Sequence, residues 1–406
     1  MAEVVTTSPA VFRGRKLVLV AAAIAVLGFI LLAIGLVVDP GRAWLSYLWV
    51  FTFAFSIAVG ALIFLMIAYA TNARWMSVVR RATELVMLPL PALAVLFVPV
   101  LFGLGWLYPW HTPRGELSHH ELEILEHRHS FMNSTAFAIR AILYFAVLLI
   151  ASLLLRRWSL RRDRAADAPP PADPVAALGR ERRFASGMLP AVAFAFTFAV
   201  IDWVMSLQAV WYSTIFGIYL FAGGFLSAIA IVTIYTARLW MHQEGHRWIT
   251  RNHFHALGRL LFAFTVFWTY AAFFQAMLIK IANKPEEVTF YIARTEGAWW
   301  VFVWILIVGH FLLPFLFLMP RAIKFRPQAM AGAGAWLVLM HLVDTYWIVI
   351  PAQVQGAFPF HWLDLGALAA VLGTCVAVAA WRQRGVTLVA ERDPFIVEGA
   401  VYRSPL

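Results

Sequence analysis

The sequence predicts an all-α membrane protein, a polytopic bundle of about ten transmembrane helices. Of its 406 residues 62% are hydrophobic, and the mean hydropathy of +0.78 lies above that of water-soluble domains. Apolar runs of about 20 residues recur along the chain, and a helix of that length crosses a hydrocarbon layer of roughly 30 Å. The runs do not alternate polar and apolar residues, as the strands of a membrane β-barrel would.

Ten such runs follow one another within a single integral membrane domain, residues 1–406. The basic segments NARWMSVVRRATEL, before the third run, and TRNHFHALGRLLFA, before the seventh, resemble each other. This likeness indicates a repeated four-helix unit. We therefore expect two four-helix bundles, spans two to five and six to nine, and two peripheral helices. The expected spans are approximately 17–38, 47–71, 84–106, 134–155, 187–208, 212–237, 256–280, 298–319, 330–351 and 362–381.

The basic residues predict the orientation of the chain. The net charge of +11 could suggest a nucleic-acid partner, but most of the 32 lysines and arginines lie in the two tails and in every second loop. That alternation is typical of loops that stay on the cytoplasmic side of a membrane. We therefore expect both termini in the cytoplasm, membrane lipids as neighbours and no nucleic acid.

Two segments depart from the regular pattern of spans and short loops. Pro89, Pro91 and Pro99 remove backbone donors inside the third span, so we expect a bent helix that its neighbours cover. Between spans four and five, residues 156–186 contain a proline-rich stretch and read as a cytoplasmic linker loop.

Ionisable residues within the spans are the candidate functional groups. Each costs about 2.5–3.5 kcal/mol on insertion scales, so such residues normally face the bundle interior and mark paths for protons or substrates. His341 and Asp344 share a helical face, and a carboxylate beside an imidazole forms a proton relay or a structural hydrogen-bond pair. The proton-path candidates are Asp202, His310, His341, Asp344, Glu84 and Arg259.

A second group of polar residues is expected near the outer face. Asp202 and Arg140 lie at similar depth on consecutive spans, which fits either a salt bridge or an acid that accepts a proton from a ligand. Ser206 follows Asp202 by one helical turn. The residues placed near a quinone or a partner subunit are Arg140, Ser206, Gln275 and Lys280.

The chain is expected to carry no metal and no cofactor of its own. Cys375 is the single cysteine, which excludes a cysteine-ligated cluster within this chain. His310 and His341 lack the wide, repeated spacing of bis-histidine haem ligands. In the longest outer loop His120, Glu123 and His127 could share a helical face, but we favour a surface helix that contacts a partner over a metal site.

Several segments resemble one known family. The stretch IDWVMSLQAVWYSTIFGIYLFAGGF is similar to the signature of the ActF-type subunit of alternative complex III. So are VVRRATE, LEHRHSFMNSTAFAIRAILYF, HFHALGRLLFAFTVFWTYAAFFQAMLIKIANKPEEVTFYIAR and ERDPFIVEGAVY. The resemblance covers nearly the whole chain and is most specific over residues 74–300. These subunits belong to the NrfD/PsrC-like family of ten-helix membrane proteins, which agrees with the spans counted above.

The resemblance implies an integral subunit of a bacterial inner-membrane respiratory complex that oxidises quinol and reduces cytochrome c or another electron acceptor. Its implied partners are multihaem and monohaem cytochromes c, an iron–sulfur protein, an ActC-type NrfD-like subunit and, as a further option, a terminal oxidase. Haem c and iron–sulfur clusters are then carried by those partners. The implied role of this chain is assembly and proton conduction without catalysis of its own.

Two alternatives stay open. The chain could bind quinone and oxidise quinol directly, which predicts an apolar pocket that opens to lipid near the outer face and is lined by a histidine or an aspartate. It could instead be a secondary transporter, which predicts helix breaks at matching positions of two halves. The prolines of span three have no counterpart in span seven, which disfavours a transporter.

Overall fold

The computed structural model describes residues 10–113, 119–164, 171, 173–208, 210–354 and 360–404. Within these ranges ten helical segments are long and apolar enough to cross a membrane, which confirms the all-α polytopic fold. The spans are α1 (Arg15–Val38), α2 (Pro40–Ala70), α3 with α4 (Met76–Met87 and Leu90–Phe102), α7 (Ser134–Arg164), α9 with η1 (Gly179–Trp203 and Met205–Leu207), α10 (Phe216–Met241), α11 (Arg251–Ala282), α13 with η2 and α14 (Trp299–Ile305, Leu306–Leu312 and Leu313–Leu318), α16 with η3 (Pro327–Val349 and Ile350–Ala352) and α17 (Trp362–Gln383).

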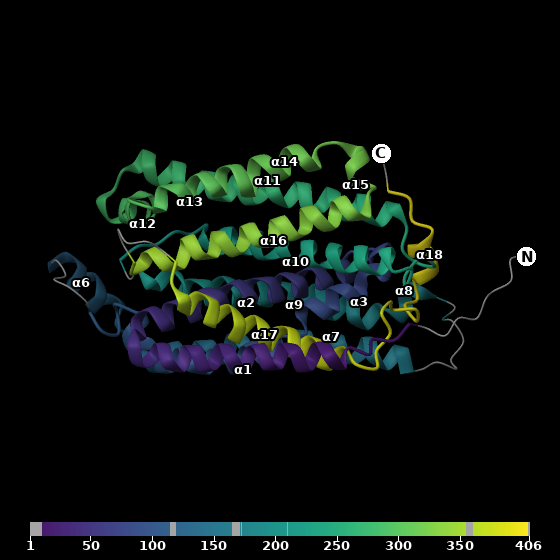
Figure 1. The fold of residues 1–406 in the computed structure, drawn as a ribbon, viewed down its shortest axis with the longest axis horizontal. Coiled ribbons are helices and arrows are strands. Elements are labelled where there is room, and N and C mark those ends of the chain that lie inside the picture. Colours follow the sequence, from purple (N-terminus) through teal and green to yellow (C-terminus); the bar gives the residue numbers. More distant parts are fainter. Residues whose placement is uncertain are drawn as a thin grey trace, which may run out of the picture.

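Short helices cover both ends of the bundle. Figure 1 shows α6 and α12 at one end and α8, α15 and α18 at the opposite end, where the basic loops lie. These elements are α5 (Leu104–Leu107), α6 (His119–Arg128), α8 (Pro174–Ala177), α12 (Pro285–Thr295), α15 (Arg321–Lys324) and α18 (Ile396–Ala400).

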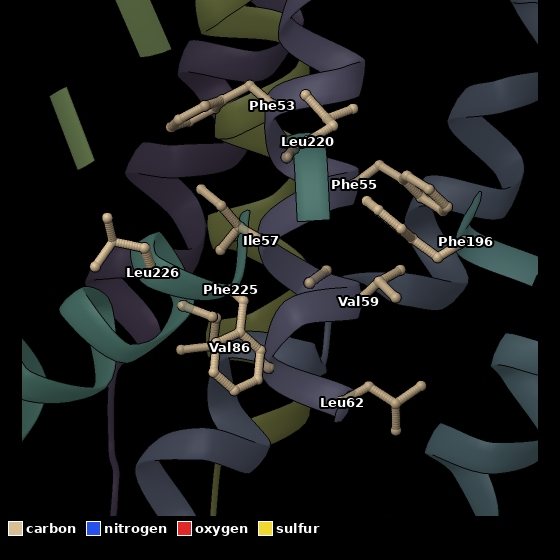
Figure 2. Close-up of a cluster of buried hydrophobic side chains, with 14 of the residues drawn as sticks. Phe53, Phe55, Ile57, Val59, Leu62, Val86, Phe196, Leu220, Phe225 and Leu226 are labelled. Atoms are coloured by element: carbon tan, nitrogen blue, oxygen red, sulfur yellow. The ribbon is translucent and has the colours of Figure 1, made fainter. Parts of the chain in front are cut away.

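Helix α2 is the centre of the packing, because it contacts helices on every side. In its most apolar window 94% of the residues are buried. Figure 2 shows Phe55 of α2 beside Phe196 of α9, and their rings stack with centroids 5.8 Å apart. On another side α2 crosses α10 so closely that a Cβ on Gly224 would lie 2.6 Å from the backbone oxygen of Ser56. Only glycine permits that approach, which brings α2 next to the second half of the chain.

The helices pack in two groups around this crossing. Helices α2, α3 with α4, α7 and α9 contact one another in the first half of the chain, and α10, α11, α13 with α14, and α16 do so in the second. Helices α1 and α17 pack side by side against the outside of α2 (Figure 1). The buried residues of α1 recur every three or four positions, and most of them are small, so one narrow stripe faces α17.

The structure corrects two boundaries that were expected from hydropathy. Helix α2 begins at Pro40 rather than near residue 47, because the Asp39 side chain accepts a hydrogen bond from the Arg42 backbone N–H and proline fits the first helical position. The expected 156–186 loop is largely helical where it is described, since arginine is a good helix former and continues α7 to Arg164. Residues 165–170 and 172 lie outside the described part.

The prolines of the third span act as expected on the backbone. The helix ends at Met87 and resumes at Leu90, with Pro89 in the break between α3 and α4. The expected interior position holds for α3, which is buried along nearly its whole length. It is wrong for α4, where Val95 is 69% and Phe102 is 78% exposed on the lipid-facing side.

Candidate functional site

A group of polar side chains lies buried where α2, α10, α11, η2 and α16 meet. Its centre is Asp344, which accepts a hydrogen bond from the Tyr219 hydroxyl at one oxygen and from Trp268 Nε1 at the other, the latter at 3.1 Å. His341, one turn earlier on α16, places its Nδ1 3.8 Å from Asp344 Oδ2. We call this group the Asp344 cluster, and its members are Ser56, Tyr219, Trp268, His310, His341 and Asp344, all at most 4% exposed.

The Ser56 hydroxyl oxygen lies 2.9 Å from two partners, the backbone oxygen of Phe53 and His341 Nε2. When the hydroxyl donates to Phe53, His341 Nε2 is the donor to Ser56, and in a neutral imidazole of that tautomer Nδ1 carries a lone pair. That lone pair faces the Asp344 carboxylate without a hydrogen-bond partner among the described residues. A proton on either group, together with a movement of the two atoms to hydrogen-bond distance, would convert this repulsion into a charge-assisted hydrogen bond.

Gly223 of α10 makes room for this arrangement. A Cβ at this position would lie 2.5 Å from Nδ1 and 2.7 Å from Cε1 of His341, and 3.5 Å from Asp344 Oδ2. These distances to the ring are well below ordinary van der Waals contact, so any larger residue would displace the His341 ring. The glycine therefore defines the distance between α10 and the relay pair on α16.

His310 lies at the edge of the cluster on a distorted part of its helix. Residues Leu306–Leu312 form a π-helical segment, and such segments occur frequently at functional sites. The His310 ring stacks on Trp268 with centroids 3.8 Å apart and is fully buried. Neither ring nitrogen has a hydrogen-bond partner in the described part of the chain. An imidazole with two unsatisfied nitrogens in an apolar layer is costly, which favours a role beyond packing.

An apolar cavity of about 580 Å³ adjoins the cluster between α11, α12 and the η2 helix. Tyr219 and Trp268, the two donors to Asp344, form part of its wall, together with Gln275 and Tyr291. The rest of the lining is almost entirely apolar. Phe273, which is 64% exposed, lies at the lipid-facing side of the wall. The volume and lining are those of a site for a small, mostly apolar molecule.

A buried arginine on α12 lies next to the cavity wall, between its lining residues Tyr291 and Thr295 in sequence. Arg294 donates to the backbone oxygens of Phe290 and Ile348, at 2.8 and 2.5 Å, and its guanidinium lies 3.5 Å from the Phe290 ring centre. Desolvation by burial lowers the pKa of Arg294 and raises the pKa of Tyr291 to about 12. Tyr291 is therefore a neutral phenol at pH 7, hydrogen-bonded at 3.1 Å to Gln275.

Asp202 and Arg140 form a separate site near the end of the bundle that carries α6. Arg140 donates to both carboxylate oxygens, at 2.7 and 3.2 Å, and the Tyr144 hydroxyl donates to Asp202 at 2.8 Å. Ser206 donates to the backbone oxygen of Asp202. The structure thus contains the salt bridge that was expected between Asp202 and Arg140. Among the described residues, Asp202 and Asp344 share no hydrogen-bond partner. A fully paired carboxylate of this kind joins α7 to α9.

Glu84 belongs to a third site, a dense ion network at the basic end. Arg81 donates to it at 2.5 Å, Arg156 donates to the same oxygen, and Arg80 lies 3.5 Å from its other oxygen. Arg80 also pairs with Asp393 of the C-terminal segment. These buried ion pairs join α3, α7 and the C-terminal segment to one another, which is a structural role.

The remaining sequence candidates lie apart from these sites or only border them. Arg259 and Lys280 occupy exposed positions on α11, whereas Gln275 is buried and also accepts a hydrogen bond from Ser213 at 3.0 Å. In the outer loop α6 forms as expected, with His127 Nδ1 3.0 Å from the Glu123 backbone oxygen. The side chains of His119 and His120 lie outside the described residues, so the interpretation of that loop stays a prediction.

Sequence reasoning selected the acidic and basic members of the cluster but missed its neutral ones. Tyr219, Trp268 and Ser56 look like ordinary members of apolar runs, because aromatic and small residues fill every span. The sequence contained one indication that Tyr219 could face the site. It lies four residues before Gly223, so both face the same side of α10.

Comparison with known proteins assigns no family to this chain. No protein-family model matches the sequence, and no curated protein matches it. The resemblance to ActF-type subunits therefore stays an expectation based on the segments quoted above.

Proposed function

We propose that this chain is an integral subunit of a bacterial respiratory complex of the alternative complex III type, and that the Asp344 cluster handles protons within it. The observation that carries this proposal is the facing pair of His341 Nδ1 and Asp344 Oδ2. The pair is completely buried, with the two atoms 3.8 Å apart, and each residue is held by hydrogen bonds of its own, His341 by Ser56 and Asp344 by Tyr219 and Trp268.

Burial gives this arrangement its chemical meaning. A carboxylate without water is tolerated only where donors compensate the lost hydration, and Tyr219 and Trp268 supply two such donors. His341 Nδ1 faces Asp344 Oδ2 at 3.8 Å and has no hydrogen-bond partner among the described residues, so a small movement of the ring lets a proton pass between the two groups. The Ser56 hydroxyl contacts His341 Nε2 and orients the ring. In this proposal Tyr219, Asp344 and His341 form a short proton relay, with Ser56 as a positioning residue.

In this proposal the redox groups are carried by the partner subunits. The implied partners are cytochromes c, an iron–sulfur protein and a second NrfD-like subunit. With the positive-inside rule, the end that carries α8, α15 and α18 faces the cytoplasm, and the α6 and α12 end faces those partners. In this orientation both chain termini are cytoplasmic and the membrane is the bacterial inner membrane.

A second candidate function, direct quinol binding, is supported by the apolar cavity between α11 and η2, although its lining contains, among the described residues, no histidine or aspartate, which the sequence-based prediction required. Quinol is largely apolar with two hydroxyl groups, which suits an apolar cavity with Gln275, Tyr291 and Trp268 in its wall. A quinol there would lie next to the donors of Asp344, so its protons would have an acceptor close by. Electrons would pass to a cluster or haem of a partner subunit.

The transporter alternative has less support. Transporters of the inverted-repeat type have discontinuous helices at corresponding positions of two halves. Here α3 and α4 are interrupted at Pro89, whereas α11, the corresponding helix of the second group, runs without a break from Arg251 to Ala282.

The proposal is tested by purification of the native complex in mild detergent, with haem spectra and identification of every copurified subunit. We expect c-type cytochrome absorption and an iron–sulfur protein in stoichiometric amounts. Isolation of a colourless protein without cytochrome partners would refute the assignment to a quinol-oxidising complex. Photolabelling with a reactive quinone analogue, followed by peptide mapping, tests the second candidate, which requires labelled peptides from α11 or η2.

A further inference from the structure

Three arginines form a line on the outer face of α7. Arg157, Arg161 and Arg164 are separated by four and three residues, the spacing that places side chains on one face of a helix. All three are exposed. Within the described residues none of them has an acidic partner, although positive charges in such close succession repel one another. The line begins directly after the apolar part of α7, at the level expected for lipid headgroups.

The other arginines of this region behave differently. Arg156 and Arg162, which interrupt the line in sequence, turn into the protein and pair with Glu84 and Glu181. The acids are thus used to neutralise the inward arginines, and the outward ones are left without them. The orientation of the helix in the membrane depends on how many arginines lie at this end and not on which of them are paired with acids. Orientation alone therefore does not explain why the inward arginines are paired and the outward ones are not.

The outward arginines border a groove between α7 and the end of α17. This α7 groove has a volume of about 430 Å³ and is lined by Arg157, Arg161, Arg164 and Arg382, with Leu153 and Leu160 as apolar wall. Arg382 is held in place by a 2.9 Å hydrogen bond to the backbone oxygen of Leu88. The lining contains no carboxylate. Arg156 also lines the groove, and its buried Nε has no hydrogen-bond partner among the described residues.

A second basic cavity of about 760 Å³ adjoins the groove and shares Arg382 with it. It is lined by Arg13 and Arg384 from the two tails and by Trp381, which is 61% exposed. An exposed tryptophan beside arginines is typical of the membrane–water interface. The positive region therefore continues around the end of α17.

We propose that the α7 groove binds the phosphate headgroup of an anionic phospholipid from the membrane leaflet at the basic end. Guanidinium groups bind phosphate oxygens through paired hydrogen bonds, and basic pockets between transmembrane helices are suited to acidic headgroups. Leu153 and Leu160 offer the acyl chains an apolar surface on the membrane side of the arginines. This site is independent of the Asp344 cluster and of the proposed respiratory function.

The test uses the full-length protein, with its partner subunits where they copurify, in nanodiscs and in detergent. The variant R157Q/R161Q/R164Q removes the line, and R182Q/R247Q/R251Q removes the same charge from exposed positions at the same end. Native mass spectrometry after stepwise delipidation counts retained phosphatidylglycerol and phosphatidylcholine. Each arginine near an anionic surface contributes roughly a five-fold factor, so we expect retention of phosphatidylglycerol to weaken on the order of 100-fold in the first variant only.

The outcomes separate the possible ligands. Specific retention of phosphatidylglycerol by the wild type and the control variant, and its loss from R157Q/R161Q/R164Q, would support the site. The lysine variant R157K/R161K/R164K, which keeps the charge, should recover part of the binding. Equal retention of phosphatidylcholine, equal loss in the control variant, or displacement of the lipid by millimolar inorganic phosphate would overturn the proposal. Thermal unfolding checks that all variants remain folded.

Discussion

The substitution Gly223→Ala tests the geometry of the Asp344 cluster without touching a titratable group. The added methyl would lie 2.5 Å from His341 Nδ1 and 2.7 Å from Cε1, whereas ordinary contacts begin near 3.4 Å. The His341 ring, which is completely buried, would have to move by roughly 1 Å, and overpacking of this kind costs about 1–3 kcal/mol. That movement would also disturb the 2.9 Å contact between His341 and Ser56.

The assay combines thermal unfolding of the purified complex with quinol-dependent reduction of its acceptor. Gly332→Ala is the matched control, because Gly332 lies on the same α16 helix as His341 and a Cβ there meets no atom within 4 Å. We expect the control to be neutral or stabilised by up to about 1 kcal/mol through helix propensity. Gly223→Ala should be less stable and slower. Wild-type stability together with wild-type turnover in Gly223→Ala would refute the proposed packing of α10 against the relay.

Two further substitutions test the neighbouring sites. Asp202→Asn leaves the partly buried Arg140 without its carboxylate and should lower the free energy of unfolding by roughly 1–3 kcal/mol, measured by thermal unfolding. In a double-mutant cycle with Arg140→Gln, zero coupling would contradict the ion pair. Ala272→Trp fills the cavity beside α11 and should abolish quinone photolabelling. The control Ala263→Trp, at an exposed position of the same helix, should leave the labelling unchanged. Unchanged labelling in Ala272→Trp would exclude the cavity as the quinone site.

The fold was predictable because hydropathy and charge act over whole segments. A run of about 20 apolar residues has few alternatives to a transmembrane helix, and local errors do not change that outcome. The boundaries were less predictable, since they depend on single interactions such as the Asp39 side chain that begins α2 at Pro40. The exposure of α4 depends on which helices surround it, which hydropathy does not record.

The site was predictable where two partners share one helical face or lie at the same depth on consecutive spans. His341 and Asp344 share a face of α16 by spacing alone, and Asp202 and Arg140 could be matched by depth. Tyr219 and Trp268 come from two other helices, and their hydroxyl and indole groups are recognisable as donors only when the packing brings them to Asp344. Glu84 was one of the proton-path candidates, but the three arginines around it favour a structural role.

The most direct test of the central claim is the turnover of Asp344→Asn in the assembled complex. Asparagine keeps the shape of the side chain but cannot hold a proton for His341, so the relay should fail while the subunits stay together. We predict at least an order-of-magnitude loss of quinol-dependent electron transfer per haem, in line with the usual contribution of a positioned acid or base. Asp202→Asn, a second buried carboxylate, should retain its turnover per assembled complex. Wild-type turnover in Asp344→Asn would contradict a proton-handling role for the Asp344 cluster.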